Sequence, residues 1–215
     1  SISKLIIIKV KSSLNFQPAG KFKTNFSLLS KLRRNEMKND FTNECGLGFE
    51  NLTTIEEKIT RIEDIIAIHD LKARYGRMCN DDHNYNLIDT IFSPNIKWEG
   101  DPDDPWGSAE GRDAFIELFK GFQKLMDGRC LGHNITNGCI TFIDDTHAKG
   151  HWHLFGAYRS GDESKGKGAG FLEQGYYDDD YVKIDGKWYI ETLRFKDNLV
   201  ADPSVGWKDE LIQEF

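Results

Sequence analysis

The chain has 215 residues, 39% of them hydrophobic and 12% aromatic, which suffices for one domain with a core plus an appended segment. Its formal net charge is −7, from 35 acidic and 28 basic residues. This balance argues against nucleic-acid binding, which needs a surface that neutralises phosphates. No apolar run approaches the roughly 20 residues of a membrane-spanning helix, and Leu5-Ile6-Ile7-Ile8 is too short for a signal peptide. We therefore expect a cytoplasmic protein that binds neither nucleic acid nor membrane.

Cysteine spacing gives no sign of a metal site. The four cysteines form neither a CxxC pair nor a zinc-binding pattern, and they are Cys45, Cys79, Cys130 and Cys139. Reduced thiols in a cytosolic protein explain this pattern best.

Residues 1–52 differ in composition from the rest of the chain. They are rich in Lys, Ser and Asn and have no sustained helical or strand period, so we expect little stable structure there. Met37 follows Arg33-Arg34-Asn35-Glu36, which a translated purine-rich ribosome-binding site would encode. Our hypothesis is that Met37 is the native start and residues 1–36 an upstream extension. The domain is then residues 53–215.

Helix signals open this domain. Thr54 and Glu57 have the spacing of a capping box. Apolar residues at helical spacing extend the helix to about Asn80, and they are Ile55, Ile59, Ile62, Ile66, Leu71, Tyr75 and Met78. A short second helix carries Tyr85, Ile88 and Phe92 on one face, and Ser93-Pro94-Asn95 is predicted to stop it. A strand is expected over 96–99.

Residues 101–105 form a turn-rich acidic loop. A calcium site is an alternative interpretation, but the spacing of an EF-hand is absent. Gly111-Arg112-Asp113 then opens a third helix, whose apolar stripe we interpret as core: Phe115, Leu118, Phe119, Phe122 and Leu125.

From Arg129 onward the pattern is that of β strands, over 130–143, 147–158, 168–183 and 187–195. Asp144-Asp145 and Asp185-Gly186 are predicted hairpin turns. Helices followed by a long antiparallel meander indicate an α+β fold, in which the helices cover a curled antiparallel sheet and form a pocket.

Several stretches, in this order, resemble the SnoaL-like branch of the nuclear-transport-factor-2-like (ketosteroid-isomerase-like) superfamily. They are residues 65–75, Phe92-Ser93-Pro94-Asn95-Ile96, residues 111–115, Gly132-His133-Asn134, Gly150-His151-Trp152 and residues 176–190. Within this branch the pattern is most similar to the bile acid 7α-dehydratases, and more distantly to the scytalone dehydratases and hexachlorocyclohexane dehydrochlorinases. The resemblance implies a cone-shaped α+β barrel, an eliminating enzyme without a cofactor, and a homodimer packed through the open sheet face.

The resemblance also implies an acid/base pair, a His at the start of a strand and an Asp at the end of the first helix. His133 matches the His. Counting back from Phe92-Ser93-Pro94 places the Asp at Asp81, whereas counting forward from Tyr75 reaches Asn80, and Asp82 is a third option. We favour Asp81. The alternative is that Asp81 and Asp82 only form the turn at the helix C-terminus, where acids are electrostatically disfavoured, and this tilts the interpretation toward a functional role. Tyr75 matches a phenol that contacts the substrate oxygen, although a helical Tyr is as often a packing residue.

The strand at 147–158 alternates with period two, so Gly150, Trp152, Leu154, Gly156 and Tyr158 share one face. By resemblance this face lines the pocket, for which we select Trp98, Phe119, Trp152, Tyr158 and Tyr177. Tyr177, Asp179 and Tyr181 also alternate together, and either close the pocket or pair with Lys183 outside it. His151 and His153 could form a metal pair, but no third ligand is evident, and an outer-face or interface role is favoured.

Two positions depart from the bile acid dehydratase pattern, since Gly156 stands for an acidic residue and Gly100 for a tyrosine. They predict a different substrate or pocket shape. We expect a cofactor-independent lyase of the dehydratase type, acting on a small hydrophobic oxygenated compound, steroid-like or polyketide-like, through His133, Asp81 and Tyr75. An isomerase or aldol-type cyclase, and a protein that binds a ligand without turnover, remain alternatives on the same scaffold.

Overall fold

The computed structural model describes residues 46–100, 107–126, 130–159 and 170–201, which belong to one compact unit, Cys45–Gln213. Met37, most of the predicted tail and the acidic loop at 101–105 lie outside the described residues. No helix within these ranges is long and apolar enough to cross a membrane. Cys139 takes part in a disulfide, so the expectation of reduced thiols is wrong for this residue.

Helix α3, Ile55–Asn80, begins at the predicted capping box. The Thr54 hydroxyl accepts a hydrogen bond from the Glu57 amide (3.1 Å), and the Glu57 carboxylate accepts one from the Thr54 amide (2.9 Å). The helix ends at Asn80, with Asp81 as its C-cap. Asp82 and His83 follow with φ values of 53° and 50°, so the chain leaves the helix through two left-handed residues.

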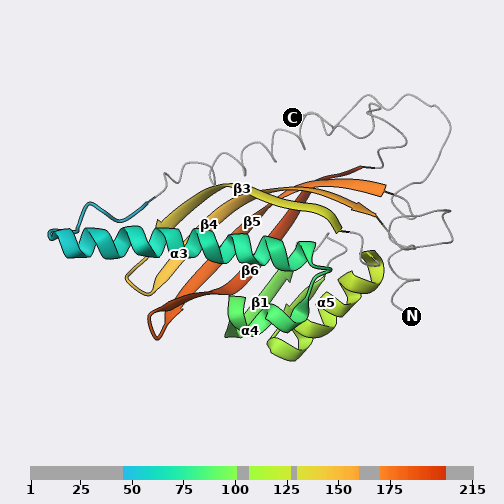
Figure 1. The fold of residues 1–215 in the computed structure, drawn as a ribbon, viewed down its shortest axis with the longest axis horizontal. Coiled ribbons are helices and arrows are strands. Elements are labelled where there is room, and N and C mark those ends of the chain that lie inside the picture. The colour runs from blue at the N-terminus through green and yellow to red at the C-terminus, as the bar shows by residue number, and fades with distance from the viewer. Residues whose placement is uncertain (1–45, 101–106, 127–129, 160–169, 202–215) are drawn as a thin grey trace, which may run out of the picture. The chain divides into compact units, whose positions relative to one another are not determined.

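The apolar stripe of α3 divides into two halves. Leu71, Tyr75 and Met78 are buried as part of the core, whereas the isoleucines of the first half are 47% to 63% exposed: Ile55, Ile59, Ile62 and Ile66. The first turns of α3 extend past the ends of the strands (Figure 1). There its buried face is polar, because Arg61 pairs with Asp145 in the β3–β4 turn, while Asp64 accepts hydrogen bonds from β5 and β6. Periodicity therefore predicted the helix correctly but not which residues the sheet covers.

A 3₁₀ turn, η1 (Tyr85–Leu87), and a single helical turn, α4 (Ile88–Ile91), occupy the place of the predicted second helix. Strand β1, Phe92–Gly100, begins earlier than expected and includes Ser93-Pro94-Asn95. Pro94 lacks an amide hydrogen, and the register of β1 shifts between Phe92 and Lys97. The irregularity accommodates the proline inside a strand.

The remaining elements are β2 (Ser108–Glu110), α5 (Arg112–Met126), β3 (Cys130–Phe142), β4 (His147–Arg159), β5 (Gly170–Ile184) and β6 (Lys187–Ala201). The strands form one sheet in the order β2-β1-β6-β5-β4-β3. All neighbours are antiparallel except β1 and β6, which are parallel, so the sheet is mixed and not purely antiparallel. The β5–β6 turn has positive φ at Asp185 and Gly186, as a tight hairpin requires.

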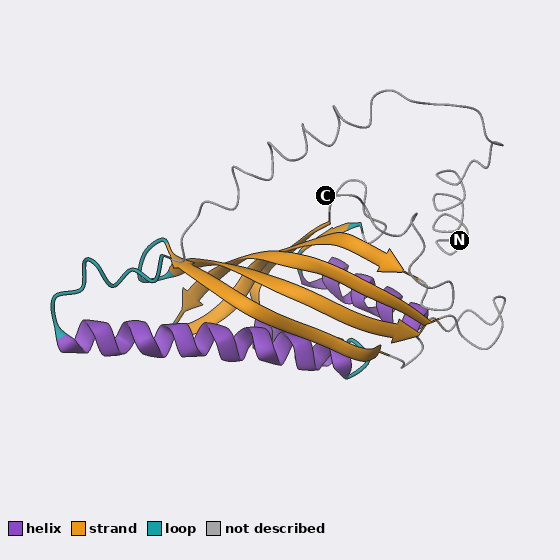
Figure 2. Ribbon diagram, turned by 90° about the horizontal axis from the view of Figure 1, so that it is seen from above, coloured by secondary structure: helices purple, strands orange, loops and turns teal. Residues whose placement is uncertain are grey.

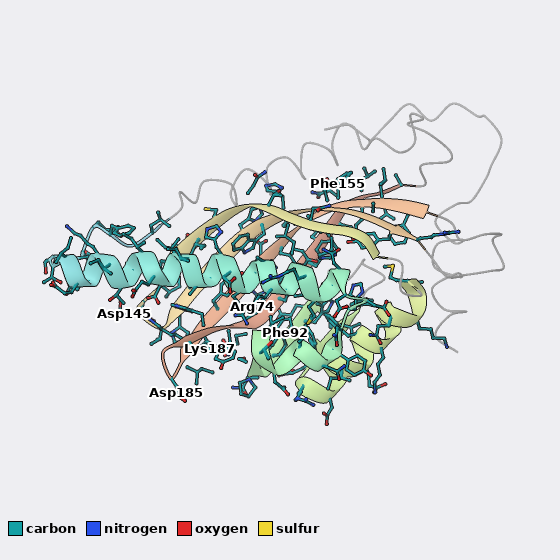
Figure 3. All side chains as sticks on the ribbon, viewed as in Figure 1. Arg74, Phe92, Asp145, Phe155, Asp185 and Lys187 are labelled. Atoms are coloured by element: carbon teal, nitrogen blue, oxygen red, sulfur yellow. The ribbon has the colours of Figure 1, made fainter. Side chains whose placement is uncertain are left out.

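The strands form a long curved layer that runs beside α3 (Figure 2). Along β4 every second side chain from Ala148 to Tyr158 is buried, which confirms the predicted inward face. Phe155, on the other face, projects away from α3 and is 50% exposed (Figure 3). The core lies between the inward face and the helices α3, α4 and α5.

A buried ion pair joins α3 to β5 inside this core. Lys72 Nζ lies 2.7 Å from Asp179 Oδ2, and the two side chains are 1% and 0% exposed. The Tyr181 hydroxyl donates a further hydrogen bond to the same carboxylate (2.7 Å). Lys183 pairs with Asp64 instead, so the alternative in which it pairs with Asp179 is wrong. Burial lowers the pKa of Lys72 and raises that of Asp179, and each charge depends on the other.

Replacing only one member of this pair should be strongly destabilising. We expect Lys72→Met to lower the free energy of unfolding by about 3–5 kcal/mol, because it leaves the Asp179 carboxylate buried without a cation. The double variant Lys72→Met/Asp179→Leu should recover most of this loss. Urea unfolding measures both effects, with Lys120→Met, which breaks an exposed pair with Glu117, as the control. Equal stability of Lys72→Met and the control would contradict this interpretation.

Candidate active site

His133 lies on β3 opposite Gly156 of β4, and only 6% of its surface is exposed. Its backbone amide donates to Asn80 Oδ1 at the end of α3 (2.7 Å). Its ring is held on both sides, with Nε2 lying 2.9 Å from the Tyr177 hydroxyl and Nδ1 2.6 Å from the Tyr158 hydroxyl. Two strands and one helix therefore fix the position of this imidazole.

The phenols extend these contacts into a chain of hydrogen bonds. The Tyr75 hydroxyl of α3 donates to the Tyr177 hydroxyl of β5 (3.3 Å). If Tyr177 then donates to His133 Nε2, the Nδ1 hydrogen of His133 points to Tyr158, and a neutral ring satisfies both contacts. At the far end Tyr158 interacts with the buried carboxylate of Glu173, which is 5% exposed. The chain thus runs from α3, through the histidine, to an acid on β5.

Electrostatics keep these groups neutral. Burial, with smaller contributions from nearby His83 and Lys72, holds the pKa of His133 well below its ordinary value. Burial also raises the pKa of Tyr75 and of Tyr177. The Lys72 ammonium lies 3.8 Å from the centroid of the Tyr177 ring and 4.6 Å from that of Tyr75. The site therefore combines a neutral base with neutral phenols next to a buried cation, an arrangement suited to stabilising negative charge on a bound oxygen.

His83 is a second buried histidine in the site, and the sequence analysis did not select it. It is 5% exposed, and its ring centroid lies 6.4 Å from that of His133. Burial lowers its pKa to about 4. The sequence signal is weak, because His83 sits in what was interpreted as a turn after the first helix. Its inward direction depends on the left-handed backbone at Asp82 and His83, which the sequence pattern does not reveal.

Asp81, the acid favoured from the sequence, is exposed and accepts a hydrogen bond from the Asn84 side chain (2.7 Å). Among the described residues, no hydrogen bond joins Asp81 to His133, so the structure does not form the predicted pair. Counting forward from Tyr75 reached Asn80, and this is the residue that contacts His133.

A small cavity lies between these groups. Its volume is about 30 Å³, which is room for roughly one water molecule. The predicted pocket residues Trp98, Tyr158 and Tyr177 line it, whereas Trp152 and Phe119 are buried but are not among the lining residues. The full lining comprises Tyr75, His83, Trp98, Phe122, Met126, His133, Tyr158, Glu173, Tyr177 and Phe195.

The two glycines that depart from the expected pattern have structural reasons. A Cβ atom at Gly156 would collide with the ring and hydroxyl of Tyr158, so this glycine lets the phenol fold back along β4 to reach His133. A Cβ atom at Gly100 would collide with the carbonyl oxygen of Gly107, which accepts the Gly100 amide hydrogen bond. The tyrosines that line the cavity are Tyr75, Tyr158 and Tyr177, and none stands at position 100, where the bile acid dehydratase pattern has one.

Two other places in the fold are less suited to acid/base chemistry. A hollow of about 700 Å³ lies along the exposed side chains of β1 and β6. Its charged side chains pair with one another, for example Lys97 with Glu110 and Arg194 with Glu99. On the outer face of β4, His151 is bonded to Asp178 (2.7 Å). Among the described residues no group of three or more metal-ligating side chains occurs.

Known proteins share this architecture. The sequence profile of the SnoaL-like domain matches residues 60–194. The chain belongs to the SnoaL-like domain family. Its fold is accordingly that of the nuclear-transport-factor-2-like superfamily, with helices before a curved sheet that is not closed, as β2 and β3 are its edges.

Solved structures agree with this fold. A candidate scytalone dehydratase from Novosphingobium aromaticivorans is 21% identical with a TM-score of 0.58, covering 67% of this chain and 91% of that one. The hexachlorocyclohexane dehydrochlorinase LinA-type3 from Novosphingobium barchaimii is 17% identical with a TM-score of 0.56, covering 67% and 93%. A protein of unknown function from Mycobacterium tuberculosis is 21% identical with a TM-score of 0.52, covering 73% and 83%. At these identities the likeness shows the fold alone.

The low pKa of His83 makes stability depend on pH. Below pH 6.5 the unfolded chain protonates His83, whereas the folded protein does so only near pH 4. The free energy of unfolding therefore decreases as the pH falls from about 6.5 to about 4. We expect wild-type protein to lose about 2 kcal/mol more than His83→Asn between about pH 7 and pH 5. Urea unfolding at both pH values measures the difference. Equal losses in the two proteins would contradict the buried, neutral state of His83.

Proposed function

We propose that this protein is a cofactor-independent lyase of the dehydratase type. Its substrate would be a small hydrophobic oxygenated compound, of a steroid-like or polyketide-like class, that carries a hydroxyl group near a carbonyl. The observation that carries the proposal is the buried, neutral His133, held by two phenols at the wall of an apolar cavity. Two structural neighbours are named as a dehydratase and a dehydrochlorinase, which supports the same reaction class. A substrate of that size would have to open the cavity by moving side chains of its wall.

In the proposed reaction His133 acts as the general base. It takes the proton from the carbon next to the carbonyl, and the electron pair of that C–H bond moves toward the carbonyl oxygen. In the complex the Tyr177 hydroxyl turns its hydrogen from His133 Nε2 to this oxygen, which leaves Nε2 free to take the proton. Tyr75 turns its hydrogen from Tyr177 to the same oxygen, and Lys72 beneath the two rings stabilises the growing negative charge. The C–O bond then breaks, a C=C bond forms, and His133 returns its proton to the leaving hydroxyl, which departs as water.

Contacts of His133 Nδ1 stabilise the ring once it is protonated. His133 Nδ1 keeps its contact with Tyr158, and the Glu173 carboxylate beyond Tyr158 favours the transient positive charge. This arrangement takes the place of the Asp81 contact expected from the family pattern. The proposal therefore assigns the basic role to His133 and no contact with the substrate to Asp81.

An isomerase or aldol-type cyclase remains the second candidate, because the same neutral base and phenols would move a proton without expelling a hydroxyl. Two imidazoles with ring centroids 6.4 Å apart favour it specifically, since two bases can take a proton from one atom and return it to another. Mass spectrometry separates the candidates, because only the lyase product is lighter than its substrate by one water.

The catalytic role of His133 can be tested with the aldol adduct of benzaldehyde and acetone, a β-hydroxyketone whose dehydration gives the conjugated enone benzalacetone. We expect wild-type protein to form the enone and His133→Ala to lose at least about a hundredfold in turnover while still binding the adduct. The control is His147→Ala, an exposed residue at the start of β4. Turnover of His133→Ala equal to that of the control would reject the proposal.

A homodimer through the outer face of the sheet is also part of the proposal. Phe155 is 50% exposed on this face. His151 and His153 lie on the same face, with their ring centroids 5.3 Å apart. A second copy would cover this face. We expect sedimentation to show a dimer for wild-type protein and a monomer for Phe155→Asp, with Ile55→Asp on α3 as the control. A monomeric wild-type protein would contradict this assignment.

A further inference from the structure

The proposed mechanism leaves one polar side chain of the cavity unused, that of His83. The residue is 5% exposed, and its Nδ1 atom is buried without a hydrogen-bond partner among the described residues. An unsatisfied buried nitrogen costs about 1–3 kcal/mol, so natural structures rarely keep one without a reason. A bound molecule that supplied the missing hydrogen bond would recover this cost.

The backbone holds the ring in place. Asp82 and His83 are both left-handed, and the turn is closed by bonds from the His83 amide to the Cys79 carbonyl (3.2 Å) and from the Asn84 amide to the Met78 carbonyl (3.1 Å). Left-handed residues other than glycine cost energy and gather at functional sites. The imidazole then packs against Phe119 and Phe122, with ring centroids 5.7 and 5.3 Å away. The imidazole is therefore held at the wall of the cavity by a rigid turn.

The two histidines lie close together at the wall of the same cavity. Their ring centroids are 6.4 Å apart and their planes are nearly perpendicular, at 82°. The two rings are therefore close enough for one small molecule in the cavity to contact both. A hydroxyl group can both donate and accept, so it can bind His83 Nδ1 in either tautomer of that ring. It would lie within reach of a proton returned by His133.

We propose that His83 is a second catalytic residue, which binds the leaving hydroxyl of the substrate through Nδ1. The inference rests on the lyase function proposed above. His83 only makes a hydrogen bond and keeps its own proton. The proton that leaves carbon moves to His133 and then to the oxygen, whose bond to carbon breaks as water departs. This role narrows the substrate class to β-hydroxyketones, in which the hydroxyl is carried by the carbon next to the one that loses its proton.

Turnover of the benzaldehyde–acetone adduct provides the first test. His83→Phe keeps a flat ring but removes the hydrogen bond, and we expect kcat/KM to fall about a hundredfold, as when one polar contact to a reacting oxygen is lost. His83→Asn suits the left-handed backbone and restores a polar group, so it should recover about tenfold of this loss. His83→Ala repeats the comparison if the Phe variant does not fold. Unchanged kcat/KM in the Phe or Ala variant, with activity lost in His133→Ala, would overturn the role of His83 and leave the lyase function intact.

Binding provides a second test that needs no turnover. In the His133→Ala background, equilibrium dialysis should report affinity for the adduct and for benzalacetone, which lacks the hydroxyl. We expect an added His83→Phe to weaken binding of the adduct about tenfold and to leave binding of benzalacetone unchanged. Equal effects on both compounds would overturn the inference. If wild-type protein binds the adduct without dehydrating it, the lyase function is rejected, and the comparison of the two compounds still tests whether His83 binds the hydroxyl. If the protein binds neither compound, the result counts against the lyase function and against the role of His83.

Discussion

The requirement that His133 stay uncharged inside the protein organises the whole site. Its imidazole is buried, and both ring nitrogens are bonded to phenols, which can donate or accept and so suit a neutral ring. A cation nearby would be costly by itself, and Lys72 is tolerated because Asp179 balances it at 2.7 Å. The Lys72 ammonium in turn lies against the rings of Tyr75 and Tyr177, so the charge that disfavours an imidazolium also favours an oxyanion beside those phenols.

Strand geometry explains how a short chain brings these groups together. Tyr177 and Asp179 are two residues apart on β5, so one reaches the histidine and the other the lysine from the same face. Gly156 and Tyr158 have the same spacing on β4, and the missing side chain of the first makes room for the second. The parallel pairing of β1 with β6 adds Trp98 and Phe195 to the wall of the cavity. Each functional contact thus follows from a local rule combined with a long-range pairing.

Much of the fold was predictable because it depends on local signals. The capping box at Thr54 and the Asp185-Gly186 turn fix where elements begin and end, and the structure confirms both. The alternation along β4 correctly predicted its inward face. What failed depends on contacts distant in sequence. One is the parallel β1–β6 pair. The other is the first half of α3, where its buried face has polar partners in the β3–β4 turn, β5 and β6, and Ile55 and Ile59 are exposed.

The site was predicted in part for the same reason. His133, Tyr75, Tyr158 and Tyr177 are brought together, as their positions in regular elements allowed. Asp81 is exposed and bonded to Asn84, and His83 was missed because its direction is set by two left-handed residues in the turn after the helix. In a helix or strand the period of apolar residues indicates which way a side chain points, but an irregular turn has no such period.

The protonation of His133 tests this account most directly. In a carboxylate–histidine pair the pKa of the ring is raised, whereas burial between two phenols beside Lys72 lowers it. Nitrogen NMR of histidine-labelled protein, with His133→Gln to assign the signal, would follow the ring as the pH is lowered. The account predicts that His133 stays neutral, with its proton on Nδ1, well below pH 6.5. A ring that becomes protonated at or above pH 6.5 would contradict it.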